Sequence, residues 1–428
     1  MSGKEGDVQC IDDEILQKLN LKNRNKFLNN NLMNILKPED MNFLKSIQKF
    51  YVKYEKENNI NHSEDFYEWI PDFGKEGLIS HINNFNMIDL DYKKYGMVAE
   101  FARVMATDFF DPQLAMGMGA TVLAVNPLTL HHEGIPVRLE ALKEMVIGKK
   151  IGCVCITEPE RGSDAVHMTT ICEKNEDGSF SLNGTKIYQT NGPKADWAIV
   201  YATTERNSSN KMAQFLVNTE WEGWNVQRVN IPWTPRIYIG KEIFTDLQIP
   251  DNSYILGPPG EGRELLFEGL NLERLGIVIL NLAEAWNALT HANIFVNMRK
   301  QFDQEILKFQ GVGFTLANIW SQIMTLTLAT LHLCEIVDEK LEKFDGAPPK
   351  QISLALGVTA SQLKLQSSKL SERACYECGN LMGGAGVCDN TLMEDLIGIS
   401  RIQEIGGGTR QIQQYIMSLA LRQLFRMI

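Results

Sequence analysis

Long helical patterns at both ends of the chain enclose a central block of short β-type segments, and this order limits the possible folds most strongly. Before residue 150, apolar side chains recur every three or four positions, as on one face of a helix, over residues 41–56, 92–106, 113–124 and 136–147. From Arg263 onward, helical patterns return over residues 265–295, 313–341, 349–381 and 409–425, each long enough for a helix of an extended bundle. We therefore predict a mainly α protein with a β domain in its middle.

The central block, residues 152–255, has the pattern of an antiparallel sheet. Short β-type runs (GCVCIT, NEDGSFSLNG, DWAIVYATT, AQFLVNT and NVQRV) are separated by turn signals such as Glu176-Asp177-Gly178 and Asn183-Gly184. Strands of this length and spacing favour a small barrel or a sandwich. Pro258-Pro259-Gly260 marks the end of the block. We predict an Asn-rich extension with one loose helix, a helical domain, the β domain and a helical bundle, at residues 1–40, 41–150, 151–258 and 259–428.

Composition and charge exclude several classes of protein. With 428 residues, 44% of them hydrophobic and 22% charged, the chain is close to an average soluble globular protein and unlike a disordered or collagen-like one. Its net charge of −11 argues against a nucleic-acid partner, which normally requires a basic face. No run approaches about eighteen apolar residues, so we expect no membrane helix. The eight cysteines and the start of the sequence, which has no apolar signal segment, predict a reduced, cytoplasmic protein.

The short motifs of common binding sites are weak. Cys375 and Cys378 form a CxxC pair without a second pair or histidines at ligand spacing, so we expect two ordinary thiols on a helix. The segment 131–133 (HHE) does not have HExxH spacing. The segment 116–119 (MGMG) lacks the third glycine of a dinucleotide fingerprint and lies in a helical pattern. These observations predict neither a metal site nor a nicotinamide-binding Rossmann domain.

Six segments, taken in order, are more informative than any single motif. They are ITEPERGSD, LNGTKIYQTNG, LERL, RKQF, MGGAGV and EIGGGTRQI, at residues 156–164, 182–192, 272–275, 299–302, 382–387 and 404–412. Together they resemble the acyl-CoA dehydrogenase family over about residues 40–428. The resemblance implies the fold of that family, in which a helical domain, a β-barrel and a four-helix bundle follow one another, and it implies FAD as the cofactor.

The resemblance places the flavin against the β domain. Hydroxyls and backbone donors at strand ends suit the polar edge of the ring and the diphosphate, and Tyr188 offers a flat aromatic face where the family often has Trp. The implied contacts are Ile156, Thr157, Gly162, Ser163, Tyr188 and Thr190, with Thr409 and Gln411 from the C-terminal segment. From residue type alone, Ser163 could also be a turn residue and Tyr188 a residue of the barrel core.

A second set of residues resembles the part that holds the FAD adenosine and diphosphate of a neighbouring subunit. Arg299 offers a guanidinium fork for phosphate oxygens, and glycines let backbone N–H groups approach closely. The set consists of Arg299, Phe302, Asn380, Gly383, Gly384 and Gly386, and the family commonly has Gln where Asn380 stands. Because such FAD sites are built between subunits, the resemblance implies a homo-oligomer, the family's tetramer.

Two positions in the family can carry the catalytic base. Many members have a glutamate directly before the Gly-Thr of the C-terminal motif, where this chain has Gly407. Members resembling isovaleryl-CoA and long-chain acyl-CoA dehydrogenases carry the base on a bundle helix, just before an arginine, and Glu273-Arg274 matches that position. From residue type alone, Glu273 could also be a surface carboxylate with an i,i+4 partner. The resemblance also implies that Ser163, Asn271 and Arg274 contact the substrate.

The resemblance implies an acyl-CoA dehydrogenation of the kind found in β-oxidation. A carboxylate with an ordinary pKa of about 4.3 is a poor base for the α-proton of a thioester, but burial beside an acyl chain raises the pKa. The Gly407 N–H and a flavin ribityl hydroxyl would stabilise the charge on the thioester oxygen. The β-hydrogen leaves as hydride to flavin N5, the product is a 2-enoyl-CoA, and by resemblance an electron-transfer flavoprotein takes the electrons.

Two alternatives remain open. The same fold could act on a cyclic acyl-CoA, with 1,4-elimination assisted by an aspartate of the helical domain, or as an enoyl-CoA reductase or a decarboxylating dehydrogenase. Asp108 and Asp111 lie in a suitable stretch for that aspartate, although a helix N-cap role is the simpler interpretation of either. The chain could also be a non-catalytic scaffold, which would stay colourless when FAD is supplied.

Overall fold

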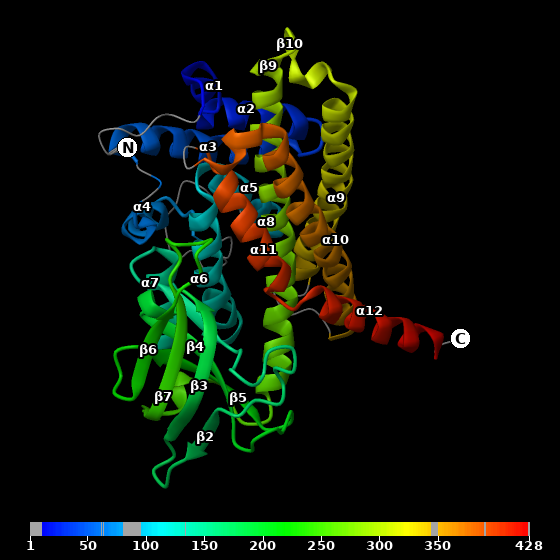
Figure 1. Cartoon of the computed structure of the whole chain (residues 1–428). Helices are drawn as coiled ribbons and strands as arrows, with labels where there is room; N and C mark the ends of the chain where they lie inside the picture. Colours follow the sequence, from blue (N-terminus) through cyan, green and yellow to red (C-terminus); the bar gives the residue numbers. More distant parts are fainter. Residues whose placement is uncertain are drawn as a thin grey trace.

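The computed structural model describes residues 11–60, 62, 64–79, 96–132, 134–343, 350–388 and 391–426. Residues 92–95 of one expected helix and Glu133 lie outside these ranges. Helices cover the upper part of the molecule, the sheet lies below them, and one long helix runs through most of its length (Figure 1).

In the described part of the chain, seven α-helices precede the sheet. They are α1 (Asp13–Lys18), α2 (Leu21–Leu32), α3 (Pro38–Asn58), α4 (Ile70–Lys75), α5 (Met97–Phe110), α6 (Pro112–His131) and α7 (Pro136–Val146). The helices predicted over 41–56, 113–124 and 136–147 are confirmed, and α5 begins and ends a few residues later than predicted. Proline at the first position of α3, α6 and α7 explains where these helices begin, because that position needs no N–H donor.

The N-terminal segment is a packed part of the fold, which corrects the prediction of a loosely helical extension. Leu21, Leu28 and Leu32 are spaced along one face of α2 and are buried in the main core. Arg24 also points inward, where its Nη1 donates to Oδ1 of Asn287 at 3.2 Å. The Asn-rich composition concealed this face, because its buried residues include Arg24 and Asn25 besides the three leucines.

The sheet contains β1 (Gly152–Cys155), β2 (Ile171–Lys174), β3 (Phe180–Thr190), β4 (Trp197–Thr203), β5 (Met212–Asn218), β6 (Trp224–Val229), β7 (Ile239–Ile249) and β8 (Ile255–Gly257). Along β4, Trp197, Ile199 and Tyr201 pack towards the helices, whereas the alternate residues Ala198 and Val200 pack between the strands. Both faces of β4 are therefore buried, which explains its continuous apolar sequence.

The strand order is β6-β7-β3-β2-β4-β5-β8, with β1 paired in parallel to β4. Among the described residues β6 and β8 are the two ends of this order, and they do not pair with each other, so no closed barrel is present. The prediction of a sheet domain is confirmed, and the prediction of a barrel is not. Strands β2, β7 and β8 were missed. In β7, the residues Lys, Glu and Asp interrupt the alternation of apolar side chains.

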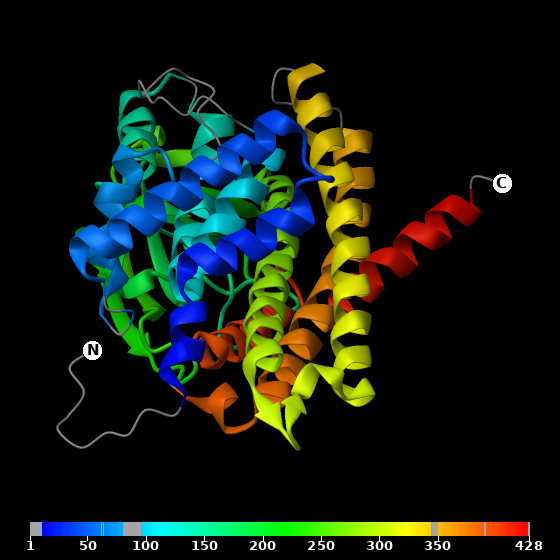
Figure 2. The same cartoon turned by 90° about the horizontal axis from the view of Figure 1, so that it is seen from above.

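The C-terminal half contains α8 (Gly262–Met298), α9 (Gln310–Lys343), α10 (Lys350–Met382), α11 (Met393–Ile405) and α12 (Arg410–Phe425). Helices α8, α9 and α10 lie side by side, and α12 projects away from the body (Figures 1 and 2). A two-stranded hairpin, β9 (Lys300–Gln301) and β10 (Gln304–Glu305), joins α8 to α9. The four predicted helices of this half are confirmed, whereas α11 and the hairpin were missed.

Among the residues that the structure describes, two helices are long and apolar enough to cross a membrane, by length and composition alone, although the sequence predicted none. In α6, 78% of the apolar window is buried inside the protein, as in a core helix. In α9 only 22% of the window is buried, so most of this helix lies on the surface of the isolated chain. Phe314, Trp320 and Leu328 are exposed there. Exposed apolar faces of this kind are also typical of surfaces that are buried between subunits.

Candidate functional site

Glu273 lies on the N-terminal half of α8 and is half-buried, without an i,i+4 carboxylate–cation pair. Burial raises the pKa of Glu273 above its ordinary value, although the charges of Arg274 and Lys364 and a hydrogen bond from the Gly407 backbone oppose that rise. A carboxyl group in this setting accepts a proton more readily than a solvated one does. This is the electrostatic environment that a general base requires.

The segment that faces Glu273 is the glycine loop, Gly406-Gly407-Gly408, which connects α11 to α12. Gly407 has φ of +61° and Gly408 has φ of +98°, so both adopt backbone conformations that favour glycine. The Gly407 carbonyl accepts hydrogen bonds from Arg274 Nε at 3.3 Å and Gln413 Nε2 at 3.0 Å. The loop is thereby tied both to α8 and to the first turns of α12.

Gly407 and Glu273 occupy neighbouring space. A Cβ atom added to Gly407 would lie 3.6 Å from Oε1 of Glu273 and only 2.7 Å from Cδ1 of Ile277. The two positions at which the sequence could have placed a base therefore meet at one point. Arg274, buried next to them, donates from Nη1 to Oδ1 of Asn271 at 2.9 Å, so the structure also brings Asn271 and Arg274 to this point.

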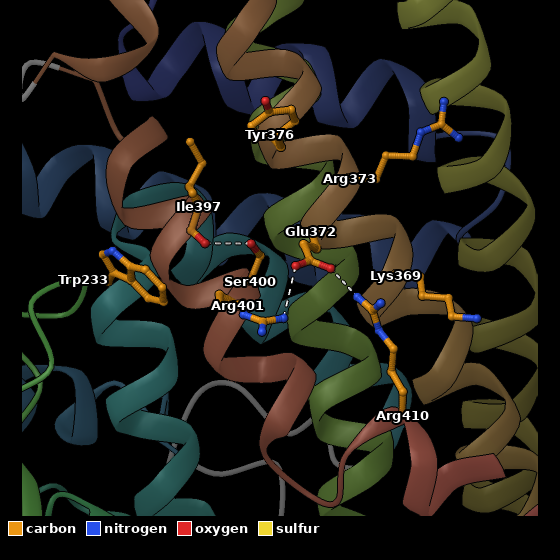
Figure 3. Close-up of a pocket in the computed structure, with 9 residues that line it drawn as sticks. All are labelled: Trp233, Lys369, Glu372, Arg373, Tyr376, Ile397, Ser400, Arg401 and Arg410. Atoms are coloured by element: carbon orange, nitrogen blue, oxygen red, sulfur yellow. Dashed lines mark hydrogen bonds and ion pairs between the residues drawn. The ribbon is translucent and has the colours of Figure 1, made fainter.

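A network of ion pairs holds the other side of the glycine loop. Arg401 on α11 and Arg410 at the start of α12 both contact Glu372 on α10, and Figure 3 shows the two arginines converging on that carboxylate. Arg410 also lies 2.7 Å from Oε1 of Glu404. The helices before and after the loop are thus fixed to the same residue of α10.

This network lines a pocket of about 450 Å³ that also includes Trp233, Lys369, Arg373, Tyr376, Ile397 and Ser400. None of the residues predicted from the sequence lines it, although Arg410 lies between the predicted Thr409 and Gln411. Its arginines pair with Glu372, Glu377 and Glu404, so most of its positive charge is balanced. We assign the network a structural role at the loop.

On the sheet, the structure brings Thr157 next to β3. The Thr157 carbonyl accepts hydrogen bonds from the Ile187 backbone N–H at 2.9 Å and from Gln189 Nε2 at 3.2 Å. Between these two residues, Tyr188 has φ of +68° at an irregularity of the β3–β7 register, and its side chain is 61% exposed. Tyr188 is therefore not a core residue. A strained backbone that turns an aromatic ring outward is typical of a binding site.

The remaining predicted residues of the β domain follow β1 or end β3. Ile156 and Thr190 are half-buried, and Gly162 and Ser163 are exposed in the turn after β1. No atom lies within 4 Å of a Cβ added to Gly162, so the space above this turn is open. Thr409 caps α12, with its Oγ1 accepting from the Ile412 N–H at 3.5 Å, and Gln411 is exposed in the first turn.

A third group of predicted residues lies at the far end of the bundle. Arg299 ends α8, and its guanidinium has no hydrogen-bond or ion-pair partner within the described part of the chain. Phe302, at the tip of the β9–β10 hairpin, has φ of +51° and is 87% exposed. Asn380, Gly383 and Gly384, where α10 ends, are also exposed. At about 1.5 Å per residue, Arg299 lies about 39 Å along α8 from Glu273.

Asp108 and Asp111 have structural roles. Asp111 caps α6 by accepting from the Leu114 N–H at 3.0 Å, and it pairs with Arg236 at 2.6 Å, which confirms the N-cap interpretation. For Asp108 that interpretation was wrong, because Asp108 is inside α5, fully buried, and accepts from Asn287 Nδ2 at 3.1 Å. Cys375 and Cys378 are buried free thiols on α10, as expected.

Sequence reasoning missed several buried ionisable residues, among them Lys364 and Glu242. Lys364 lies on a face of α10 whose other buried members include Ala360, Ser361 and Ser368, and a lysine among such small residues was the available signal. Glu242 in β7 is fully buried, its carboxyl oxygens have no hydrogen-bond partner among the described residues, and burial raises its pKa to about 8. No pattern in the sequence separates Glu242 from an outward-facing strand residue.

Much of the chain is similar to known proteins. Residues 260–421 match the model of the acyl-CoA dehydrogenase C-terminal domain, and residues 153–237 match that of the middle domain. A short-chain specific acyl-CoA dehydrogenase of Megasphaera elsdenii is 29% identical over 319 residues, which are 73% of this chain and 78% of the relative.

Solved structures show the same fold. Butyryl-CoA dehydrogenase from Megasphaera elsdenii superimposes with a TM-score of 0.79 at 25% identity and covers 90% of this chain and 98% of its own. An acyl-CoA dehydrogenase from Bacillus anthracis complexed with FAD has a TM-score of 0.80 at 22% identity, covering 91% of this chain and 68% of its own. The two domain matches and this fold show that the chain belongs to the acyl-CoA dehydrogenase family of oxidoreductases.

Proposed function

We propose that the protein is an FAD-dependent acyl-CoA dehydrogenase in which Glu273 removes the α-proton of an acyl-CoA thioester to give a 2-enoyl-CoA. The observation that carries this proposal is the half-buried carboxyl group of Glu273, with its raised pKa, next to the glycine loop. The family has a base at this point, and Gly407 cannot serve as one. No other carboxyl group of the described chain lies beside that loop and is also free of an ion pair.

The residues of the sheet fit a flavin. Tyr188 presents an exposed flat ring, Thr157 and Thr190 lie on either side of it, and the turn at Gly162 and Ser163 has open space above it. Such a strip could hold the ring and the ribityl chain through stacking and hydrogen bonds to hydroxyl and backbone groups. FAD, when bound, supplies the hydride acceptor for the β-hydrogen.

The chain's own groups have distinct tasks in this proposal. Glu273 takes up the α-proton, and its raised pKa makes the proton transfer more favourable than for a solvated carboxylate. The Gly407 N–H, on a loop fixed by Arg274 and Gln413, would stabilise the negative charge that develops on the thioester oxygen. Asn271 and Arg274 would orient the thioester, and Ser163 would contact the CoA portion from the sheet side.

Arg299 and Phe302 support a site shared between subunits. Both are exposed and lie about 39 Å along α8 from Glu273, so they would reach the flavin site of a second copy rather than their own. Asn380 and the glycines at the end of α10 would complete that contact. The outward apolar face of α9 is consistent with the homotetramer that we propose, and an electron-transfer flavoprotein is the proposed acceptor of the electrons.

The described cysteines are buried free thiols, which supports the proposed location in the reducing cytoplasm. The acyl group is not fixed by the residues named above. Purified protein should therefore be loaded with FAD and offered straight-chain, branched and cyclic acyl-CoAs together with an artificial electron acceptor. Bleaching of the flavin by at least one saturated acyl-CoA is expected. A protein that binds no FAD, or whose flavin no acyl-CoA reduces, would contradict the proposal.

A further inference from the structure

Lys364 is a fully buried cation on α10 that contacts the glycine loop instead of solvent. Its Nζ donates to the Glu404 carbonyl at 2.8 Å and to the Gly408 carbonyl at 2.8 Å. The first carbonyl belongs to the last turn of α11, and the second closes the glycine loop before α12. Lys364 therefore joins the two ends of the segment that contains Gly407.

These two bonds complement those that act at the centre of the loop. Arg274 and Gln413 hold the Gly407 carbonyl, while Lys364 holds the carbonyls on both sides of it. A loop of three glycines has high conformational freedom when it is not held. With these donors in place, the direction of the Gly407 N–H and its distance from Glu273 are fixed.

The charge of Lys364 also acts on Glu273. The charged groups that face Lys364 are Glu273 and Arg274 from α8, Glu404 from α11 and Arg410 from α12. Burial lowers the pKa of Lys364 to about 8, with Glu273 and Glu404 opposing that effect, and the positive charge of Lys364 in turn favours the ionised form of Glu273. The lysine and the proposed base therefore form an electrostatically coupled pair across the loop.

We propose that Lys364 is a positioning residue for the dehydrogenation: through its bonds to Glu404 and Gly408 it fixes the glycine loop against Glu273, and its charge favours ionisation of that base. This inference rests on the proposed function of Glu273. A merely structural lysine would affect stability and the hydrogen exchange of the loop amides, but it would not change the pH dependence of catalysis in a folded protein.

The test compares K364M, K364R and K369M in the full chain. K364M removes both hydrogen bonds and the charge, K364R keeps the charge, and Lys369 lies five residues further on the same helix but is exposed. We expect K364M to lower kcat by about tenfold or more with a smaller effect on KM, because misplacing a reacting group is costly. The acidic limb of the pH profile should move to higher pH in K364M and stay in place in K364R and K369M.

A second measurement does not depend on turnover. In the FAD-free protein, hydrogen exchange of the amides of residues 405–409 should be faster in K364M than in the wild type and unchanged in K369M. The inference is overturned if folded K364M keeps the wild-type kcat, pH profile and exchange rates while E273Q is inactive. If E273Q itself remains active, the proposed base is wrong, so the two failures can be told apart.

Discussion

Oε1 of Glu273 lies 3.6 Å from the point that a Cβ atom on Gly407 would occupy, although the two residues are 134 positions apart in the sequence. Ile277, one turn further along α8, closes the same space from the other side, with Cδ1 at 2.7 Å from that point. A side chain at position 407 would therefore contact the Glu273 carboxyl group. The positive φ of Gly407 favours a residue without a side chain at that position.

Because the two positions are neighbours, we predict that the catalytic carboxylate can be moved from position 273 to position 407. G407E should inactivate the enzyme, because two carboxyl groups so close together cannot both ionise, and it should cost about 1–3 kcal/mol of stability because of the positive φ. E273G should also be inactive, whereas the double variant E273G/G407E should recover part of the turnover. G407A serves as the control for backbone strain without charge. A folded, FAD-loaded double variant that is as inactive as E273G would contradict the shared position.

Tyr188 should contribute to flavin binding and little to folding. Its left-handed backbone costs about 1–2 kcal/mol in a non-glycine residue, and its ring is mostly exposed. We expect Y188G to unfold at the same denaturant concentration as the wild type or a higher one, but to lose FAD on gel filtration. Y188F, which keeps the ring, should retain the cofactor. A destabilised Y188G that still binds FAD normally would show that the ring belongs to the core.

Glu242 should make the stability of the protein depend on pH. Its carboxyl group has no partner and a pKa of about 8 in the folded state, compared with an ordinary value of 4.5, so folding favours the protonated form. The stabilisation is fully present below the ordinary value and is lost as the pH rises through about 8, at about 1.4 kcal/mol per pH unit.

Urea unfolding of E242Q at several pH values checks this effect. The free energy of unfolding of E242Q should fall less steeply between about pH 5 and about pH 8 than that of the wild type. E222Q, which changes an exposed glutamate close to β6, should keep the wild-type slope. Parallel curves for E242Q and the wild type would mean that Glu242 is ionised or paired in the folded protein.

Arg299 should contribute to FAD binding and little to the stability of its own subunit. Since its guanidinium has no partner within the described residues, R299M should change the free energy of unfolding of the FAD-free protein by no more than about 0.5 kcal/mol. The affinity for FAD should fall clearly. K300M, at the adjacent exposed lysine, is the matched control and should bind FAD as the wild type does. Equal FAD affinities in R299M and the wild type would show that Arg299 does not contact FAD in the proposed site between subunits.

Much of the fold could be predicted because it depends on periodicity. The long helices α8, α9 and α10 have repeating apolar residues over many turns, and β4 is apolar on both faces. The sheet was harder: β7 contains buried Glu242 among exposed charged residues, so its alternation does not show which face is inside. The sequence could not show whether the sheet closes into a barrel. Closure would require β6 and β8 to pair with each other, and no local sequence pattern shows whether two distant strands pair.

Part of the candidate site could be predicted because short sequence motifs, rather than periodicity, point to it. Glu273, Gly407 and Tyr188 were named through motifs. The structure places Glu273 next to Gly407 and exposes Tyr188, and their catalytic and binding roles stay predictions. Lys364 and Glu242 were not found, because their importance comes from what surrounds them after folding. The docking of α2 was missed for the same reason, since the partners of Arg24 lie on α5 and α8.

The most direct test of the account is the rate of flavin bleaching in E273Q, measured with the acyl-CoA that reduces the wild type fastest. The variant should fold, bind FAD and bind the acyl-CoA, but bleach at least about a hundredfold more slowly, because the amide cannot accept the α-proton. E268Q, at an exposed glutamate of the same helix, should bleach at the wild-type rate. Bleaching of E273Q at the wild-type rate would show that another group abstracts the proton.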